Sequence, residues 1–167
     1  KIVTQCPHCL TTLKNDYAEI GTDLEVVHHS EFISDLIKDG KIEPEASLEE
    51  DVTFHDACYV GRHHGEYDAP RDVLQSVLSE KATIKEMPRN KQDSFCCGAG
   101  GGNMWYEIKQ GKRINVERFE EAIETGVKKV ATSCNFCMIM MEDGRKVTGQ
   151  DKNMEVYDIA ELVAERI

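Results

Sequence analysis

The sequence predicts an α/β fold with a mainly parallel sheet and flanking helices. Short apolar segments rich in β-branched residues alternate with longer amphipathic segments, which is the pattern of strands joined by crossover helices. A motif near the start of the chain recurs near its end, which indicates two related units. The chain of 167 residues, 40% of them hydrophobic, is long enough to bury a core.

Six short apolar segments are expected to be strands, because β-branched and other apolar residues fill most of their positions. In chain order they are residues 2–4, 24–27, 52–55, 83–87, 129–132 and 155–157. The segments between them have helical periodicity. Leu36 lies three residues after Ile33, and Val77 lies three residues after Leu74. The expected helices are residues 9–19, 31–38, 69–79, 113–125, 135–142 and 158–166.

The internal repeat sets the expected domain organisation. Residues 1–10 (KIVTQCPHCL) parallel residues 129–138 (KVATSCNFCM), and the similarity resumes after each second strand. We therefore expect residues 1–40 to be the tail of a first, truncated unit, 41–50 an acidic linker, and 51–167 a complete second unit. Because the chain opens on Lys1 in the middle of a repeat, we expect it to be the C-terminal fragment of a longer protein.

The composition excludes several classes of function. Lys and Arg number 20 against 31 Asp and Glu, a net charge of −11, so the chain gets no electrostatic help in binding nucleic acid. The acidic residues are expected to form a solvated surface, or a docking face for a redox partner. No apolar run approaches the roughly 18 residues of a membrane span.

Seven cysteines are the main chemical signal. An odd number in a chain without a leader argues against a secreted disulfide framework and favours a reducing cytoplasm. Five of them are expected to converge: Cys58, Cys96, Cys97, Cys134 and Cys137. A zinc ion takes four ligands and would leave one thiol over, whereas an iron–sulfur centre with several irons can use all five.

Both Cys-x-x-Cys motifs fall where an expected strand ends and a helix begins. These are Cys6 with Cys9, and Cys134 with Cys137. Free backbone N–H groups and the helix dipole favour anions at such positions, so they stabilise a thiolate, which is the form that binds metal. The motif alone is also used by thioredoxin-like redox pairs. Its repetition beside three further cysteines favours metal binding.

The adjacent pair Cys96–Cys97 needs a sharp turn, because neighbouring side chains of a strand point to opposite faces. The following glycines, Gly98 and Gly100 among them, supply that freedom, and their N–H groups are expected to contact a bound cofactor. His55 lies three residues before Cys58. It is a candidate metal ligand, but a hydrogen bond to the centre or ordinary packing is the more common role.

The spacing of Cys58, Cys96-Cys97-Gly98 and Cys134-x-x-Cys137 resembles the cysteine-rich CCG domain, which usually occurs as two copies in a polypeptide. The stretches HDACYVGR (55–62) and FCCGAGGG (95–102) are most similar to iron–sulfur oxidoreductases related to the catalytic subunit of heterodisulfide reductase. Ala57 stands where many relatives have proline. The resemblance implies the same α/β architecture, built from pseudo-repeated CCG units of which the first is truncated.

The resemblance also implies that the five cysteines bind a [4Fe–4S] cluster, which in heterodisulfide reductase is non-cubane and takes part in disulfide cleavage. Cys6 and Cys9 match the last two ligands of the first copy, whose other cysteines are absent here, so we expect no first centre in this chain. Some copies in the family hold zinc. The implied partners are other redox subunits (a flavoprotein, a ferredoxin-type or a membrane-anchor subunit) and a small disulfide or thiol.

Three hypotheses of function follow. The main one is an iron–sulfur oxidoreductase fragment that passes electrons between a flavoprotein or quinone-linked partner and a disulfide or similar acceptor. The second is a zinc-binding structural or assembly module without a redox role. The third is a dithiol oxidoreductase that acts through Cys6 and Cys9 directly. The expected location is the cytoplasm, or the inner face of the membrane through a further N-terminal part or a partner.

Overall fold

Five parallel strands, each followed by a helix or helical turn, form the frame of the molecule. The computed structural model describes residues 1–106 and 110–167. The strands are β1 (Ile2–Thr4), β2 (Val26–His28), β3 (Val52–His55), β4 (Lys129–Thr132) and β5 (Glu155–Asp158). The α-helices are α1 (Pro7–Thr11), α2 (Tyr17–Glu19), α3 (His29–Lys38), α4 (Ala69–Val77), α5 (Ile114–Glu124), α6 (Asn135–Val147) and α7 (Ile159–Ala164).

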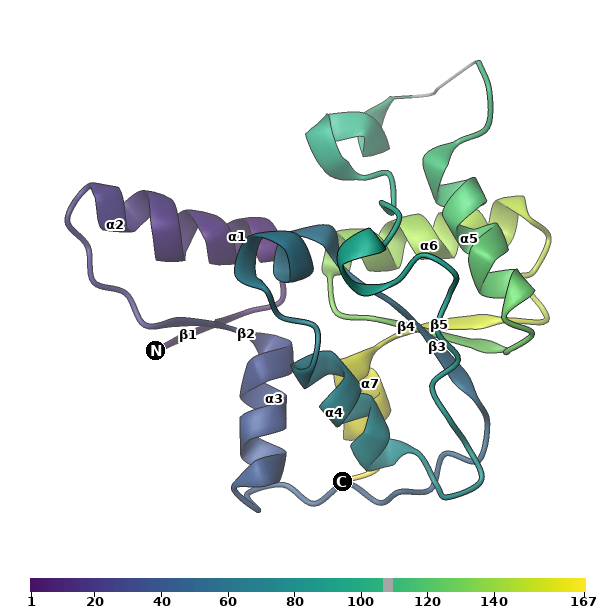
Figure 1. The fold of residues 1–167 in the computed structure, drawn as a ribbon, viewed down its shortest axis with the longest axis horizontal. Coiled ribbons are helices and arrows are strands. Elements are labelled where there is room, and N and C mark those ends of the chain that lie inside the picture. The colour runs from purple at the N-terminus through teal and green to yellow at the C-terminus, as the bar shows by residue number, and fades with distance from the viewer. Residues whose placement is uncertain (107–109) are drawn as a thin grey trace.

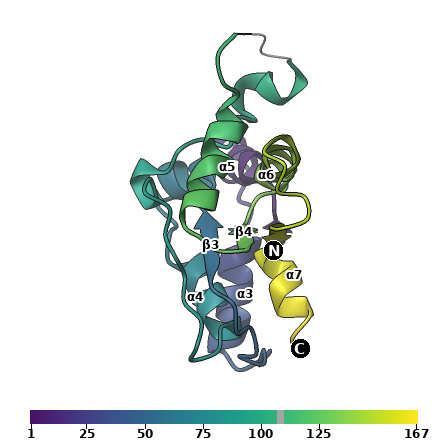
Figure 2. The ribbon, with the colours of Figure 1, turned by 90° about the vertical axis from the view of Figure 1, so that its right-hand side faces the viewer.

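The strands form two parallel sheets, one of β1 and β2 and one in the order β3-β4-β5. In Figure 1, α5 and α6 lie on one side of the larger sheet and α3, α4 and α7 on the other, and the view in Figure 2 agrees. The expected α/β fold with a mainly parallel sheet is therefore confirmed. No helix of the described ranges is long and apolar enough to cross a bilayer.

The internal repeat of the sequence is present in the structure. A π-helical turn (Thr12–Asp16) and α2 follow α1, and this helical region lies between β1 and β2 as α6 lies between β4 and β5. A helix, α3 or α7, follows the second strand in each case. The strand register is also the same, because Thr4 pairs with His28 as Thr132 pairs with Asp158. Cys6 and Cys134 then occupy equivalent positions, two residues after the ends of β1 and β4. The structure thus supports the interpretation of two related units.

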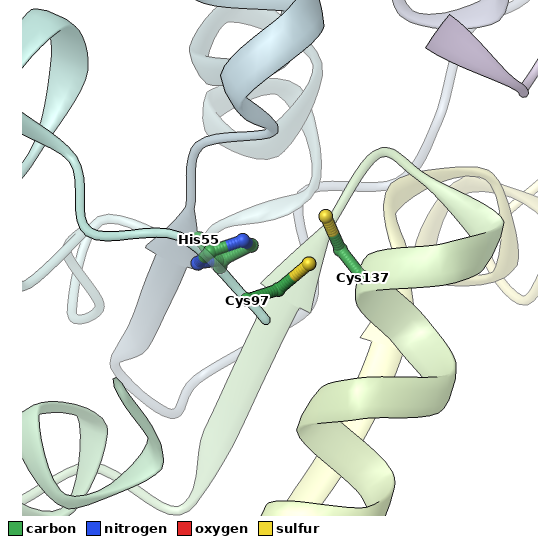
Figure 3. A group of neighbouring side chains, drawn as sticks. All are labelled: His55, Cys97 and Cys137. Carbon is green, nitrogen blue, oxygen red and sulfur yellow. The ribbon is translucent and has the colours of Figure 1, made fainter. Parts of the chain in front are cut away.

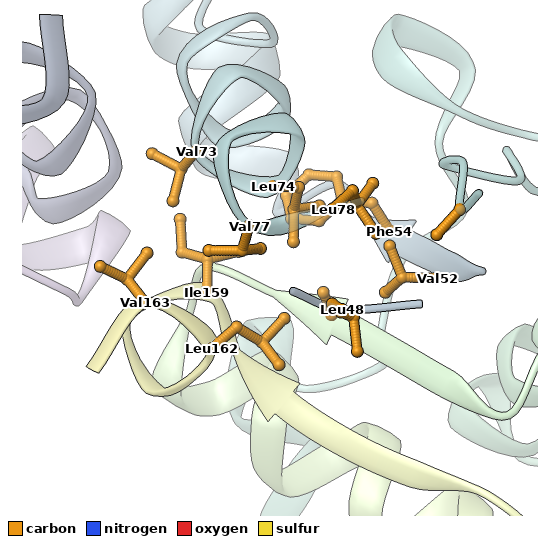
Figure 4. Close-up of a cluster of buried hydrophobic side chains, with 12 residues drawn as sticks. Leu48, Val52, Phe54, Val73, Leu74, Val77, Leu78, Ile159, Leu162 and Val163 are labelled. Carbon is orange, nitrogen blue, oxygen red and sulfur yellow. The ribbon is translucent and has the colours of Figure 1, made fainter. Parts of the chain in front are cut away.

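The largest hydrophobic cluster joins the larger sheet to α4 and α7 (Figure 4). Val52 and Phe54 of β3 face this cluster, whereas Thr53 and His55 point to the opposite face, as the two-residue period of a strand requires. Its other buried members come from α4, β4 and α7 and the segments that flank α4: Leu48, Val73, Leu74, Val77, Leu78, Ala82, Ala131, Ile159, Leu162 and Val163. A second cluster, with Phe119, Val130 and Met141, lies under α5 and α6.

The expected strand at residues 83–87 is wrong. A single parallel bridge between Val52 and Ile84 is all that forms there. The side chain of Asp51 accepts hydrogen bonds from the backbone N–H of Thr83 (2.7 Å) and from its hydroxyl (3.1 Å), so these groups are satisfied locally. Pro88 follows directly and has no N–H to extend a ladder.

The segment expected as a linker, residues 41–50, is held on the core. Leu48 is buried, its N–H donates to the carbonyl of Val77 (3.0 Å), and its carbonyl accepts from Ser79 (3.0 Å). Ile33 and Ile37 of α3 pack against the same cluster. The tail of the first unit and the second unit therefore share one hydrophobic core, while the division of the chain at residues 40 and 50 stays a prediction.

A buried polar cluster lies where the two units meet. His29 Nε2 lies 3.0 Å from Asp158 Oδ1, and Gln5 Nε2 donates to Asp158 Oδ2 (2.7 Å). His28, the repeat equivalent of Asp158, is fully buried and contacts the Ser30 hydroxyl through Nδ1 (2.7 Å). Burial, followed by the electrostatic effect of the neighbouring His29, lowers the pKa of His28 to about 4.

This shift predicts a specific loss of stability in mild acid. The unfolded chain binds a proton at His28 below a pKa of 6.5, whereas the folded chain does so only below about 4, so stability falls as the pH drops between these values. Between pH 7 and pH 5 this site should cost about 2 kcal/mol. Urea unfolding at both pH values should show this loss for the native chain, and His28→Leu should lose correspondingly less. An unchanged pH dependence in His28→Leu would contradict the prediction.

Candidate metal centre

The five predicted cysteines come from three segments that meet at one edge of the larger sheet. Cys58 follows β3 and begins a π-helical turn, Tyr59–His63. Cys134 follows β4 and caps α6, which carries Cys137. Neighbouring parallel strands end at the same edge, so β3 and β4 bring these segments together. Cys96 and Cys97 reach the same place from the loop before the 3₁₀ segment Gly100–Trp105.

The sulfur atoms form one continuous series of contacts. Each thiol shifts the pKa of its neighbour in the order Cys58, Cys96, Cys97, Cys137 and Cys134, so the five side chains lie next to one another in that order. All five cysteines line the same cavity. The long spacings of the sequence therefore end at one cavity, while the role of the five cysteines as metal ligands stays a prediction.

Cys96 and Cys134 are the positions in this series that carry negative charge most readily. Hydrogen bonds from Cys58 and then Cys97 lower the pKa of Cys96 to about 2. The hydrogen bond from Cys137 lowers the pKa of Cys134.

The other three thiols hold their protons more strongly. Hydrogen bonding to Cys96, followed by burial, raises the pKa of Cys58, and hydrogen bonding to Cys134 and Cys97 raises that of Cys137. For Cys97 the hydrogen bond from Cys137 lowers the pKa, but the hydrogen bond to Cys96 and burial outweigh it and raise the value to about 12.

Backbone N–H groups surround the thiols. Gly98 donates to Cys96 Sγ (3.3 Å), and the backbone N–H of Ala99 acts to lower the pKa of Cys97. At the start of α6, the backbone N–H groups of Cys137 and Phe136 lower the pKa of Cys134. These donors stabilise anionic sulfur, which is the form that binds metal.

The two predicted glycines behave differently. Gly98 has a φ of +88°, and a Cβ there would lie 3.1 Å from Ile114 Cβ and 3.3 Å from the Asn115 nitrogen. Both the turn and the close approach of α5 therefore require glycine at this position. Gly100 has an ordinary φ and open space around it, and it lines the five-cysteine cavity with its backbone.

His55 lies beside the cysteines and is buried (Figure 3). One imidazole nitrogen and the sulfur atoms of Cys97 and Cys137 all lie within 4.8 Å of one another. Burial, and then the nearby guanidinium of Arg118, lowers the pKa of His55 to about 3, so its imidazole is neutral at ordinary pH.

Arg118 is the important residue that the sequence interpretation missed. It is 0% exposed and donates from Nε to His55 Nδ1 (2.9 Å). It lies on the face of α5 that carries Asn115 and Phe119. The available signal was an arginine on the apolar face of a predicted helix. An arginine at such a position would be buried, and a buried arginine almost always has a specific partner.

Three aromatic rings cover the outer side of the five-cysteine cavity. His8, Tyr59 and Phe136 line it, and the His8 ring lies 4.2 Å from Tyr59 and 5.8 Å from Phe136 between centroids. His8 and Phe136 are the equivalent third residues of the two Cys-x-x-Cys motifs. His8, near the start of the chain, thus lines the cavity of the five cysteines, which lie 50 or more residues further along.

Cys6 and Cys9 lie apart from the five. They line a separate hollow of about 420 Å³ with the glycine-rich loop, Trp105, and the outer side of His8 and Phe136. Cys9 is exposed, and its N–H donates to Cys6 Sγ (3.4 Å). The rings of His8 and Phe136 line both this hollow and the cavity of the five cysteines. The role of Cys6 and Cys9 as metal ligands stays a prediction.

The residues fit a cationic metal centre. Five neighbouring thiols cannot all ionise beside one another. Hydrogen bonding between the thiols, burial and charge repulsion together raise the pKa values of Cys58, Cys97 and Cys137. Positive metal ions would replace the shared protons. The cavity encloses about 30 Å³, so bound metal would take the place of the thiol–thiol contacts.

Comparisons with known proteins agree with this chemistry. The family model described as a cysteine-rich domain, CCG, matches residues 52–142. The chain is 40% identical over 167 residues to the "Probable iron-sulfur-binding oxidoreductase FadF" of Bacillus subtilis, which covers 100% of this chain and 23% of that protein. It is 39% identical over 170 residues to the "EtfAB:quinone oxidoreductase" of Syntrophomonas wolfei, covering 98% of this chain and 23% of that protein.

A methanogen protein is similarly close. One of the subunits of the dihydromethanophenazine:CoB–CoM heterodisulfide reductase of Methanosarcina mazei is 39% identical over 175 residues, which covers 100% of this chain and 41% of that protein. The chain thus spans between about a quarter and two fifths of the length of these relatives.

Proposed function

Because this chain belongs to the cysteine-rich domain family CCG, we propose that it is an electron-transfer part of an iron–sulfur oxidoreductase related to heterodisulfide reductase. Cys58, Cys96, Cys97, Cys134 and Cys137 bind one [4Fe–4S] cluster. Residues 51–167 form the complete CCG unit that carries it, residues 41–50 are a linker, and residues 1–40 are the tail of a preceding unit.

The observation that carries the proposal is the unbroken series of five sulfur contacts around one cavity. A structural zinc site uses four ligands in a closed tetrahedron, so one of the five buried or half-buried thiols would have no role. A cluster of several irons accommodates all five. The names of the relatives, which include an iron–sulfur-binding oxidoreductase and a heterodisulfide reductase, support the same choice.

Each part of the site has a task in this function. When bound, an iron–sulfur cluster supplies one-electron transfer. The five cysteines hold it from three segments anchored on the sheet edge. The N–H groups of Gly98 and Ala99 and the start of α6 offset the negative charge of the thiolates. The rings of His8, Tyr59 and Phe136 keep bulk water from the sulfur atoms.

The names of two relatives support a choice of electron donor and acceptor. One relative is named for a reaction between the electron-transfer flavoprotein EtfAB and quinone, and another for reduction of a heterodisulfide. The chain accordingly passes electrons between a flavoprotein or quinone-linked partner and a disulfide or similar acceptor. The net charge of −11 gives a partner with a basic face a favourable approach.

Metal analysis after anaerobic purification and reconstitution tests the proposal. We expect about four irons and a matching amount of acid-labile sulfide per chain, with visible absorption that bleaches on reduction. Near-zero iron under these conditions would contradict the proposal. One zinc per chain, with no iron and no absorption in the visible range, would instead indicate a structural zinc module.

A further inference from the structure

We propose that His55 serves the bound cluster as a fixed N–H donor to sulfur and not as a metal ligand, and that Arg118 is the positioning residue that sets this role. The inference rests on the proposed iron–sulfur function, and it concerns two buried side chains to which that function assigns no task.

The first step is the contact between the two residues. Arg118 donates from Nε to His55 Nδ1 at 2.9 Å, and both side chains are buried. A guanidinium has N–H donors and no acceptor, so the Nδ1 atom that receives this bond must carry a lone pair. A neutral imidazole has one N–H, and with Nδ1 acting as acceptor the proton lies on Nε2.

The second step is the direction of that N–H. Nε2 of His55 is buried and has no hydrogen-bond partner among the described residues. The imidazole faces the sulfur atoms of Cys97 and Cys137, which lie within 4.8 Å of one of its nitrogens and of each other (Figure 3). Because Nδ1 is occupied by Arg118, Nε2 is the nitrogen available to them. Cysteine or cluster sulfur is thus the acceptor that this N–H lacks.

The same geometry excludes His55 as a ligand. A metal bound through Nε2 would move the imidazole proton to Nδ1, where it would point at an N–H of Arg118 with no acceptor between them. Arg118 cannot easily turn away. It is ion-paired with Glu121, donates to the Arg89 carbonyl (2.8 Å) and reaches the Ser94 hydroxyl (3.4 Å).

The consequence is a more positive reduction potential. Reduction adds negative charge to the cluster, and an N–H directed at its sulfur atoms stabilises the reduced form more than the oxidised form. The neutral imidazole supplies this stabilisation without adding a positive charge of its own. Arg118 also contacts Ser94, two residues before Cys96, so Arg118 helps to hold the loop that carries Cys96 and Cys97.

Redox titration of the iron-loaded chain tests this role. His55→Leu, which removes the donor, should shift the midpoint potential to a more negative value. His55→Gln should restore most of the native potential, because the glutamine amide can donate to sulfur while its oxygen accepts from Arg118. Arg118→Gln should shift the potential in the same direction as His55→Leu, because a glutamine amide can accept as well as donate and so no longer keeps the imidazole proton on Nε2. Arg118→Lys should shift the potential less, because an ammonium group only donates.

Thr53→Val is the matched control. Thr53 is buried on the same face of β3 as His55, and its hydroxyl has no partner within the described ranges. Replacing it by valine should leave the potential unchanged. A shift of the same size in Thr53→Val would mean that the strand, and not the N–H donor, controls the potential.

Pulsed electron paramagnetic resonance of the ¹⁵N-histidine-labelled, iron-loaded chain gives an independent readout. We expect a weak nitrogen coupling and an exchangeable proton, both lost in His55→Leu. A strong nitrogen coupling would indicate direct ligation and overturn the inference. Full iron content with an unshifted potential in His55→Leu would also overturn it. Absence of iron in the native chain would contradict the proposed function itself, and the donor role with it.

Discussion

Cys97→Ser is expected to remove nearly all iron from the chain. Cys97 is the central member of the series of thiols, in contact with both Cys96 and Cys137, and it is buried. A serine hydroxyl has similar size but is a much weaker ligand for iron, since soft thiolates select iron–sulfur centres. Loss of a residue that only hydrogen-bonds to a metal ligand costs about 10–100-fold in metal affinity. Loss of the Cys97 ligand itself should therefore cost more than about 100-fold. Iron and sulfide per chain after anaerobic reconstitution measure the effect.

The control for this substitution is Cys9→Ser. Cys9 is exposed, contacts Cys6 and does not line the cavity of the five cysteines. Iron content should stay near the native value in this variant. Equal iron loss in the two variants would mean that the two cysteine sets hold metal together, and unchanged iron in Cys97→Ser would mean that the constellation is not the binding site.

Leu74→Ala is expected to destabilise the chain by about 2–5 kcal/mol. Leu74 is 0% exposed on α4, in the cluster where β3, α4 and α7 meet (Figure 4). Removing the branched end of the leucine side chain leaves a cavity, which the surrounding helices and strands can fill only in part. The free energy of unfolding in urea, determined on the chain without metal, measures the loss.

Leu74→Met provides the comparison. Methionine has nearly the volume of leucine and a flexible side chain, so this change should cost less than about 1.5 kcal/mol. A loss in Leu74→Ala no larger than that in Leu74→Met would show that the cluster is not packed as the structure has it. Both variants leave every residue of the metal centre in place, so they separate stability from metal binding.

Local patterns predicted the strands well wherever a strand pairs along its length. Residues 52–55 and 129–132 were predicted with the bounds that β3 and β4 have. The segment 83–87 has similar composition but fails, because the Asp51 carboxylate takes the hydrogen bonds of Thr83 and Pro88 follows. Competition from a side chain distant in sequence is invisible to a periodicity argument.

The candidate site, like the set of strands, was predictable only in part from the sequence. The five cysteines could be grouped from their spacing and chemistry, and Gly98 from the sharp turn that the adjacent Cys96–Cys97 pair needs. The close approach of α5 to Gly98 is visible only in the structure. The role of His55 stayed open between ligand and hydrogen-bond donor. Its orientation depends on Arg118, 63 residues further along, and no short-range pattern connects the two.

The sequence by itself determined the α/β fold class, the repeat, the family and the set of thiols, because each of these is carried by residue types at set spacings. The tertiary structure alone decided that His8 lines the cavity of the five cysteines, that Cys6 and Cys9 line a separate hollow, and which imidazole nitrogen of His55 accepts from Arg118. These features arise from the packing of α5 and of the two units against the sheet. Such contacts join residues far apart in the chain, and their geometry depends on the whole fold.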